Sequence, residues 1–369
     1  MKKLSIALRI ILVWALPFVL FGQDFPRTLT YEKVLDSLQK INIAPGGVLG
    51  VYEDEKIWIG SYGYQDVKNK VLFENTTQYR CGSISKVFVA VIALQLIDEG
   101  KLCLTTPITN YIPTLSHQIP DANQITIQYL LEHSSGLGHP TEDLFSYKLK
   151  LALFPKSIGK LDYQQRLEQY AYHRKLKNEP GKDIYYSNAG YWLLGLILEN
   201  TTQESIEKLI QNRICKPLEL SSTYLTRSND QAVAKGYNYL FNNKLRLVSK
   251  WDRADNDGDP AAGLISNTPD LLHFLQALFE GKLLSETSLA LMLTVNQFPA
   301  CEPDCAYGLG IESWNSTLFK GFGKNGSSIG VDANVIYFPD QKISMVLFFN
   351  YGGGNHKYLI DYILQKYKR

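Results

Sequence analysis

The sequence predicts an α+β fold. One antiparallel sheet, built from both chain ends, is covered by helices, and a mainly helical lobe is inserted. Strand-like segments occur at 46–62 and 331–349, whereas helical patterns dominate between about 105 and 290. The 369 residues are 45% hydrophobic and 20% charged, as in ordinary globular proteins. We expect an α/β lobe over about 23–104 and 295–369, a helical lobe over about 105–294, and a cleft between them.

The N-terminal part supplies a helix, a hairpin and a buried helix. An amphipathic helix is expected over 31–41, started by Thr30. Residues 46–52 and 57–62 flank a polar turn and predict a β-hairpin. The segment 83–99 is apolar on nearly every side, which is typical of a helix buried in a large protein, and Gly100 ends it.

The middle and the tail alternate between helices and strands without repeats or low-complexity linkers. Helices are expected at five places in the middle of the chain: 126–133, 163–176, 191–200, 204–214 and 269–280. Two strands, 331–338 and 343–349, are joined by a turn at Pro339 and Asp340. A last helix is expected over 356–367.

The first 22 residues have the pattern of a secretory signal. Lys2 and Lys3 precede an apolar run over 10–21, and Gly22 supplies a small residue for cleavage. The alternative is an uncleaved anchor, although the run is short for a membrane span. We expect a mature domain over 23–369, periplasmic or secreted, with no integral membrane segment after signal removal.

Charge and ligand-forming residues exclude several classes of function. The 38 Lys and Arg balance 36 Asp and Glu without a long basic run, so no nucleic-acid partner is expected. Six scattered His form no metal-binding pattern, and no metal or organic cofactor is implied. A local disulfide and two free thiols are both open for Cys301 and Cys305.

A Ser-x-x-Lys motif is the first sign of chemistry. It occurs at Ser37, Ser83, Ser157 and Ser205, but only Ser83 follows a glycine and opens the buried helix. Helical spacing places the amine of Lys86 beside the Ser83 hydroxyl. Burial lowers the pKa of a lysine, so a partly neutral amine can accept the serine proton. The alternative is that Ser83 only caps the helix and Lys86 extends to water.

Two further motifs follow in the chain. Tyr186-Ser187-Asn188 is the only Tyr-x-Asn, and it leads into an apolar helix. Lys324-Asn325-Gly326 is the only Lys-x-Gly, and it precedes the two C-terminal strands. Two nearby ammonium groups would lower the pKa of a tyrosine and favour its phenolate, so the three motifs depend on one another.

In this order the motifs resemble those of the serine β-lactamase and penicillin-binding protein family. The Tyr-x-Asn form is similar to the branch of class C β-lactamases, D-alanyl-D-alanine carboxypeptidases, related esterases and D-aminopeptidases. Two further stretches, 125–137 and 262–271, also look similar. The resemblance extends from about Pro45 to the C-terminal helix.

The resemblance implies a role for each motif residue. Ser83 would be the nucleophile, and Lys86 and Tyr186 would share the acid and base work. Asn188 would hold Lys86 and bind the acyl amide of the substrate. His133 would be a packing residue rather than the catalytic base.

The Lys-x-Gly segment would bind the substrate. Lys324 would add positive charge near Tyr186 and the substrate carboxylate, and Gly326 would let the substrate lie against the strand edge. The backbone N–H groups of Ser83 and Ser327 would form an oxyanion hole. Asn325 departs from the family pattern, which usually has Thr or Ser there, and weakens the expected preference for a free carboxylate.

These residues predict a serine hydrolase that forms an acyl-enzyme on a small-molecule or peptide substrate, as a D-alanyl-D-alanine peptidase or esterase does. A class C-type β-lactamase is the alternative, and it differs in how fast water removes the acyl group. A non-catalytic penicillin-binding receptor is an alternative of another class.

Overall fold

The computed structural model describes residues 28–41, 44–225, 232–240, 244–298, 305–315 and 319–353. The secretory signal predicted over 1–22 and the helix predicted over 356–367 lie outside these residues. The two alternatives for Cys301 and Cys305 lie outside the described side chains as well.

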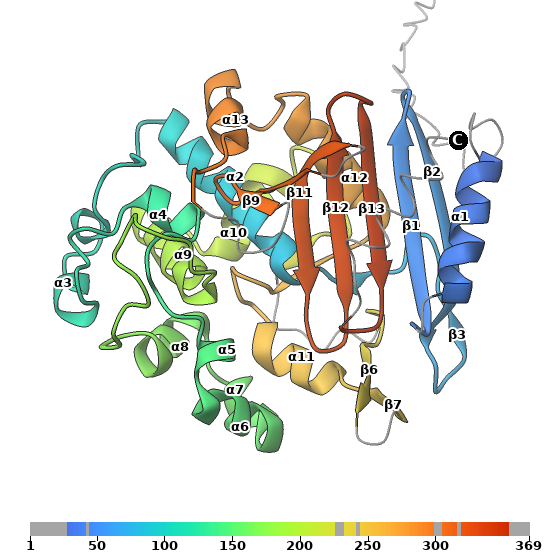
Figure 1. The fold of residues 1–369 in the computed structure, drawn as a ribbon, viewed down its shortest axis with the longest axis horizontal. Coiled ribbons are helices and arrows are strands. Elements are labelled where there is room, and N and C mark those ends of the chain that lie inside the picture. The colour runs from blue at the N-terminus through green and yellow to red at the C-terminus, as the bar shows by residue number, and fades with distance from the viewer. Residues whose placement is uncertain are drawn as a thin grey trace, which may run out of the picture.

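The predicted antiparallel sheet is confirmed, and both ends of the chain contribute to it (Figure 1). Its strand order is β3-β2-β1-β13-β12-β11-β10-β9. The central contact pairs β1 with β13, for example Leu49 with Leu347. The bounds are β1 Gly46–Glu53, β2 Lys56–Asp66, β3 Val71–Leu72, β9 Cys305–Tyr307, β10 Glu312–Asn315, β11 Lys320–Ser327, β12 Asp332–Phe338 and β13 Ile343–Phe349.

Alternating side chains give the sheet two buried faces. In β13, Met345 and Leu347 pack with helix α1 (Thr28–Ile41), whereas Val346 and Phe348 belong to the core on the other face. That second core contains α2 (Ser85–Asp98) and α12 (Thr268–Phe279). Helix α12 packs on β1, β12 and β13, although it belongs to the range predicted for the helical lobe.

The remaining elements lie mainly beside the sheet. The helices and helical turns are η1 Gly82–Ile84, η2 Ile108–Asn110, α3 Leu115–Gln118, α4 Ile127–Leu131, α5 Pro140–Asp143, α6 Phe145–Leu153, α7 Pro155–Ile158, α8 Tyr163–Tyr170, α9 Asn188–Thr202, α10 Ile206–Ile210, η3 Gln211–Cys215, α11 Ser249–Asn256 and α13 Glu286–Leu293. Five short strands complete the set: β4 Tyr79–Arg80, β5 Tyr224–Leu225, β6 Tyr237–Leu240, β7 Lys244–Leu247 and β8 Leu264–Ser266.

Three predicted helices are shorter or less regular than expected. The helix expected over 163–176 ends at Tyr170, and His173 then takes φ 59°. The helix expected over 126–133 ends at Leu131 because His133 takes φ 63°. A left-handed residue cannot continue a right-handed helix. The helix expected over 204–214 changes to a π-helical turn at Gln211.

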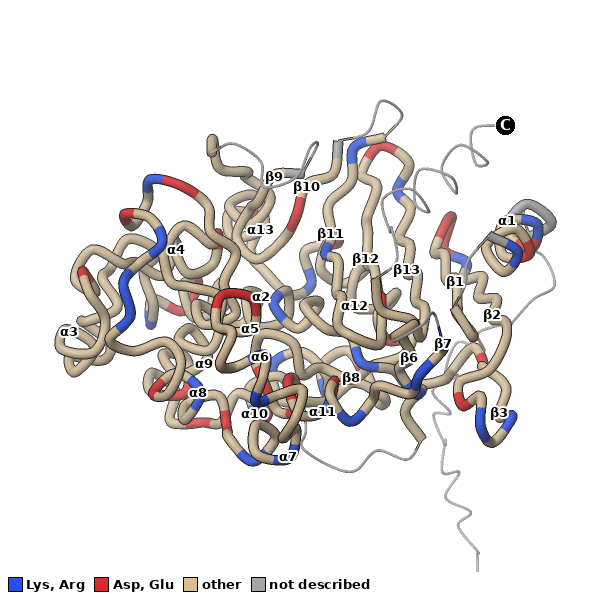
Figure 2. The backbone as a smooth tube through the Cα atoms, turned by 60° about the horizontal axis from the view of Figure 1, so that its bottom comes forward, with Lys and Arg blue, Asp and Glu red and all other residues tan. Residues whose placement is uncertain are grey.

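Charged residues are spread over the sheet and over the helices beside it. Figure 2 shows Lys and Arg interspersed with Asp and Glu along the backbone. In the described ranges, no helix is both long and apolar enough to cross a membrane.

Candidate active site

Ser83 lies on a turn that presses against the sheet. It belongs to η1, directly before α2, and its side chain is half-buried. Gly82 has φ 52°, which favours glycine, and a Cβ there would lie 3.0 Å from the carbonyl carbon of Gly326. A Cβ on Gly326 would lie 2.0 Å from the carbonyl oxygen of Cys81. The turn and β11 therefore touch through their backbones.

Lys86 lies one turn further along, fully buried. Its Nζ donates hydrogen bonds to Ser83 Oγ at 3.0 Å, Asn188 Oδ1 at 2.8 Å and the Ala261 carbonyl at 2.9 Å. Burial lowers the pKa of Lys86, and the nearby Lys324 ammonium adds to this. The alternative in which Lys86 extends to water is wrong, because the side chain has no exposed surface.

Tyr186 completes the contacts of the serine hydroxyl. Its OH donates to Ser83 Oγ at 2.7 Å. Burial raises the pKa of Tyr186, but the ammonium groups of Lys86 and Lys324 outweigh it and leave that pKa below its usual value. The two amines lie 4.8 Å and 5.2 Å from the centre of its ring.

The start of α9 holds Tyr186 and Asn188 in place. Ser187 caps the helix by accepting from the Gly190 N–H at 3.1 Å, and its own hydroxyl donates to the Gly138 carbonyl at 2.7 Å. Tyr186 precedes the cap and Asn188 begins the first turn, where it accepts from Lys86. The Tyr-x-Asn spacing thus places both side chains at one helix start.

The Lys-x-Gly segment lies on β11, which the sequence did not predict as a strand. A Cβ on Gly82 would lie 3.2 Å from the backbone nitrogen of Ser327. The structure therefore brings Ser327 beside the turn that carries Ser83. This is the arrangement expected if both backbone N–H groups face one oxygen atom.

Glu312 is a site residue that sequence reasoning missed. Its carboxylate forms a buried ion pair with Lys324 and accepts from the Asn325 N–H at 3.2 Å. It lies on β10, next to β11. The contact depends on the pairing of two strands that no sequence pattern indicated. Lys324 thus faces a negative charge within the protein, contrary to the simple expectation that it offers its charge to a substrate.

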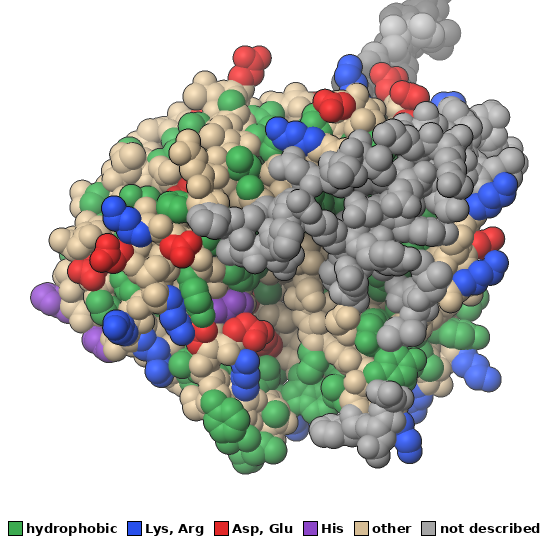
Figure 3. All heavy atoms as spheres, viewed as in Figure 1, with side chains coloured by type: hydrophobic (Ala, Val, Ile, Leu, Met, Phe, Trp, Pro, Cys, Tyr) green, Lys and Arg blue, Asp and Glu red, His purple; other side chains and the backbone are tan. Residues whose placement is uncertain are grey.

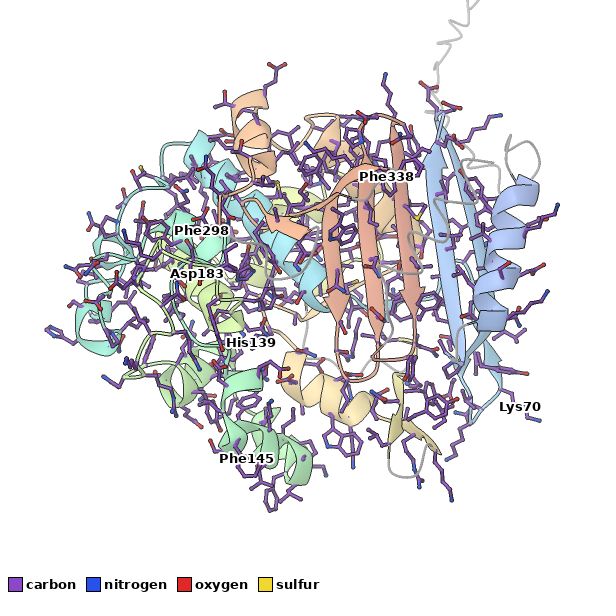
Figure 4. The ribbon with its side chains drawn as sticks, viewed as in Figure 1. Lys70, His139, Phe145, Asp183, Phe298 and Phe338 are labelled. Carbon is purple, nitrogen blue, oxygen red and sulfur yellow. The ribbon has the colours of Figure 1, made fainter. Side chains whose placement is uncertain are left out.

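Two histidines line the ring of Tyr186. The His133 ring lies 4.3 Å from it, and His133 Nδ1 accepts from the Ser187 N–H at 3.2 Å. Burial lowers the pKa of His133 well below its usual value, so the ring is neutral. The His139 ring lies 5.5 Å from Tyr186, and Figure 4 places it between the helices and the sheet. Both contacts support packing roles.

The buried carboxylate of Asp259 binds the backbone segment whose carbonyl accepts a hydrogen bond from Lys86. Asp259 accepts from the Ala261 N–H at 2.6 Å, and the carbonyl of Ala261 is a lysine acceptor. Arg166 Nη1 lies 3.3 Å from the other Asp259 oxygen. Burial raises the pKa of Asp259 to about 6, while Arg166 opposes that rise. Sequence spacing gave no sign of this support.

The other Ser-x-x-Lys matches have local roles. The Ser37 hydroxyl donates to the Lys33 carbonyl in α1, and Ser205 caps α10. Ser157 lies in the short helix α7. Within the described part of the chain, no three His, Cys, Asp or Glu side chains are arranged to hold a metal ion.

Comparison with known proteins identifies the family. Residues 32–368 match the family model Beta-lactamase. The chain belongs to the beta-lactamase family. The same fold occurs in a penicillin binding protein from Bacillus halodurans and in EstCE1, described as a hydrolase with promiscuous acyltransferase activity.

Individual relatives agree with this membership. Protein flp of Staphylococcus aureus (strain N315) is 31% identical over 253 residues, which cover 66% of this chain and 47% of that protein. The match thus spans about half the length of that relative. A Beta-lactamase of Providencia stuartii is 24% identical and covers 94% of this chain and 91% of its own. A D-stereospecific amidohydrolase from Streptomyces sp. has a TM-score of 0.79 at 26% identity, covering 90% of this chain and 97% of its own.

Proposed function

We propose that this beta-lactamase family member is a serine hydrolase that forms an acyl-enzyme at Ser83. The substrate is a small ester, amide or peptide, as for D-alanyl-D-alanine peptidases and esterases. One observation carries the proposal: Ser83 Oγ lies within hydrogen-bond distance of both Lys86 Nζ and Tyr186 OH. A weak nucleophile with two groups of lowered pKa beside it has the arrangement needed for proton removal.

The proposed reaction has two stages. Ser83 Oγ attacks the acyl carbon while its proton passes to Tyr186 or Lys86. The N–H groups of Ser83 and Ser327 bind the developing oxyanion. The leaving group then departs with that proton. Water attacks the ester in the second stage, and Ser83 regains its proton as the acid product leaves.

The ion pair at Lys324 favours substrates without a negative charge at that position. A penicillin carboxylate placed beside Lys324 would also meet the Glu312 carboxylate. A neutral ester or amide would meet no such repulsion. This observation ranks the esterase or amidase function above the class C-type β-lactamase, and also above the D-alanyl-D-alanine peptidase, whose peptide substrates end in a free carboxylate. One structural neighbour, the Streptomyces amidohydrolase, is by its name an enzyme that hydrolyses amides, which agrees with this ranking.

A time course with two substrates tests the proposal. A neutral aryl ester and a labelled penicillin are each incubated with the protein and with Ser83→Ala. We expect turnover of the ester, which Ser83→Ala abolishes, and slow or no release of the penicillin label. Rapid release of that label would instead establish a β-lactamase. An adduct without turnover of either compound would favour the non-catalytic receptor.

We also propose that the mature protein is periplasmic or secreted and begins near Gln23. The basic start and short apolar run of the first 22 residues support this. N-terminal sequencing of protein from its native host tests it. A chain that begins at Met1 would indicate an anchor.

A further inference from the structure

Helix α6 is apolar on two opposite faces. Its inner face carries Tyr147 and Leu151, which pack in a small cluster with Ile158 and Tyr170. Its outer face exposes Phe145 by 76%, and Figure 4 shows this residue at the lower edge of the molecule. A helix that only covers a core is expected to be polar outside. The outer face therefore needs another explanation.

The exposed side chains form one continuous stripe. Phe145, Leu149 and Leu153 follow helical spacing, and Phe154 continues them directly after the helix. Leu153 and Phe154 are each 62% exposed, and Leu149 is 45% exposed. We call these four residues the α6 stripe. Figure 3 shows hydrophobic side chains gathered at this edge of the molecule. Contiguous exposed apolar groups of this kind mark interaction sites.

Cationic and aromatic groups surround the α6 stripe. Residues 144–161 contain four lysines and no acidic residue: Lys148, Lys150, Lys156 and Lys160. Lys148 pairs with Glu142 at 3.1 Å, and Lys150 donates to Tyr170 OH. Lys156 and Lys160 are exposed, and no ion pair of the described residues includes them.

Helix α11 extends the same surface. It packs against α6 and α7, and its Trp251 Nε1 donates to the Ala152 carbonyl at 3.2 Å. Lys250 Nζ lies 4.0 Å from the centre of the Trp251 ring and is exposed. A tryptophan beside an exposed lysine is typical of protein surfaces at a membrane interface.

We propose that the α6 stripe and its lysines bind the surface of an anionic lipid bilayer. Aromatic and leucine side chains would enter the boundary between headgroups and acyl chains, and the lysines would contact anionic headgroups. Charge disfavours a second copy of this chain, because a two-fold contact centred on the α6 stripe would bring the surrounding lysines of both copies into one interface. The stripe lies on a projecting helix, as an interfacial helix requires.

The location relates this surface to the candidate active site. Helix α6 follows His139 and α5 directly, and the His139 ring lies against Tyr186. Asp143 of α5 accepts from the hydroxyl of Tyr185, the neighbour of Tyr186. Bilayer binding would therefore hold the tyrosine side of the site close to the lipid surface. The binding itself does not depend on the proposed hydrolase function.

Vesicle flotation with the mature chain tests the proposal. The vesicles contain phosphatidylcholine alone or with phosphatidylglycerol, at low and high salt. We expect binding to the anionic vesicles that weakens with salt. Phe145→Ser with Phe154→Ser should weaken it by about 100- to 10,000-fold, the effect of losing two buried phenyl rings. Lys156→Gln with Lys160→Gln should weaken it by about 30-fold.

A matched control separates this surface from general hydrophobicity. Val71→Ser with Leu72→Ser removes two other exposed apolar side chains, on edge strand β3, and should bind like the wild type. Trp251 emission should shift to shorter wavelength with anionic vesicles, and Trp251→Phe should remove that shift. Unchanged thermal unfolding and hydrolysis of a soluble ester would show that each variant is folded.

Three results would overturn the proposal. The first is no binding of the wild type to anionic vesicles. The second is equal binding of the Phe145→Ser, Phe154→Ser variant. The third is a dimer in solution that this double variant dissociates, which would make the stripe a contact between copies.

Discussion

The Ser83 hydroxyl accepts hydrogen bonds from two groups that can each serve as its base, and Tyr186→Phe separates their contributions. The substitution removes the OH that lies 2.7 Å from Ser83 Oγ and keeps the ring. We expect the acylation rate to fall by roughly 10²–10⁴, the effect of one positioned acid or base. Burst kinetics with a neutral aryl ester measure this step. A rate near that of the wild type would assign the base role to Lys86 alone.

Glu312 decides whether Lys324 can bind an anionic substrate. Glu312→Gln removes the competing carboxylate and keeps an oxygen for the Asn325 N–H. We expect kcat/KM for a penicillin, relative to a neutral ester, to rise by about 10- to 150-fold, the effect of one charge-assisted hydrogen bond. In the wild type, Lys324→Ala should change that ratio little. A large loss of anionic preference in Lys324→Ala would show that the lysine already binds the carboxylate.

Asn325 provides a second, independent test of the same subsite. Asn325→Thr introduces the hydroxyl that the family usually has and leaves the backbone contact to Glu312 in place. We expect higher activity on penicillins relative to simple esters, measured as the ratio of the two kcat/KM values. The gain should be larger in combination with Glu312→Gln, since groups that share a partner do not act additively. An unchanged ratio in both backgrounds would show that the side chain does not face the substrate.

The sequence predicted site residues only where a local spacing places them. Helical spacing brings Lys86 to Ser83, and one helix start carries Tyr186 and Asn188. Glu312 was missed because its contact depends on how β10 pairs with β11. Asp259 was missed because it reaches Lys86 only through a backbone carbonyl.

At the scale of elements, the contact between η1 and β11 requires glycine. A Cβ at Gly326 would lie 2.0 Å from a backbone oxygen, so Gly326→Ala must push the strand away from the Ser83 turn. We expect kcat/KM to fall by about 100-fold, because a displacement of about 1 Å has that effect on reacting groups. The melting temperature should fall as well. Steady-state kinetics and calorimetry measure both.

Gly190→Ala is the matched control for that substitution. A Cβ at Gly190, in the first turn of α9, would lie 3.8 Å from its nearest neighbour, which is ordinary contact. We expect unchanged activity and a gain of about 0.5–1 kcal/mol in the free energy of unfolding. A loss of activity equal to that of Gly326→Ala would mean that any glycine substitution near the site is harmful.

The predicted helices and strands agree with the structure where a single local sequence pattern is enough to define them. The hairpin of β1 and β2 and the strands β12 and β13 lie where they were expected, because turns and apolar runs define them. Strands β9 and β10 were missed because they are only three and four residues long. Strand β11 was missed because glycines and polar residues interrupt it, and the three strands are ordered by successive pairing outward from β12. The left-handed histidines that end two helices have no sequence signature of their own.

For the whole molecule, buried carboxylates make stability depend on pH. Burial raises the pKa of Asp252 to about 6, although Ser328, Arg80 and the Gly330 N–H oppose the rise. The folded chain therefore binds a proton that the unfolded chain has lost between about pH 4 and 6. The free energy of unfolding therefore falls as pH rises through this window. Above about pH 6, Asp252 is ionised in both states and its full destabilising effect is present.

Asp252→Asn should remove the part of this pH dependence that Asp252 contributes. We expect the difference in unfolding free energy between variant and wild type to grow, in favour of the variant, by up to about 3 kcal/mol from about pH 4 to about pH 7. Urea unfolding at both pH values measures it. Asp340→Asn, on the exposed turn between β12 and β13, is the control for the loss of one negative charge. A constant difference for Asp252→Asn would mean that the carboxylate is already ionised at about pH 4.

The pairing of β1 with β13 also determines when the molecule can work during its synthesis. The hairpin of β1 and β2 is made well before its other neighbour in the sheet, β13, which follows far along the chain. Ser83 is likewise made long before the Lys324 segment that lies against it. A nascent chain therefore has no complete site until the Lys324 segment has been made, and the proposed hydrolysis cannot begin before then. Contacts between segments so far apart in the chain also form slowly, so the unfinished chain remains unfolded for longer.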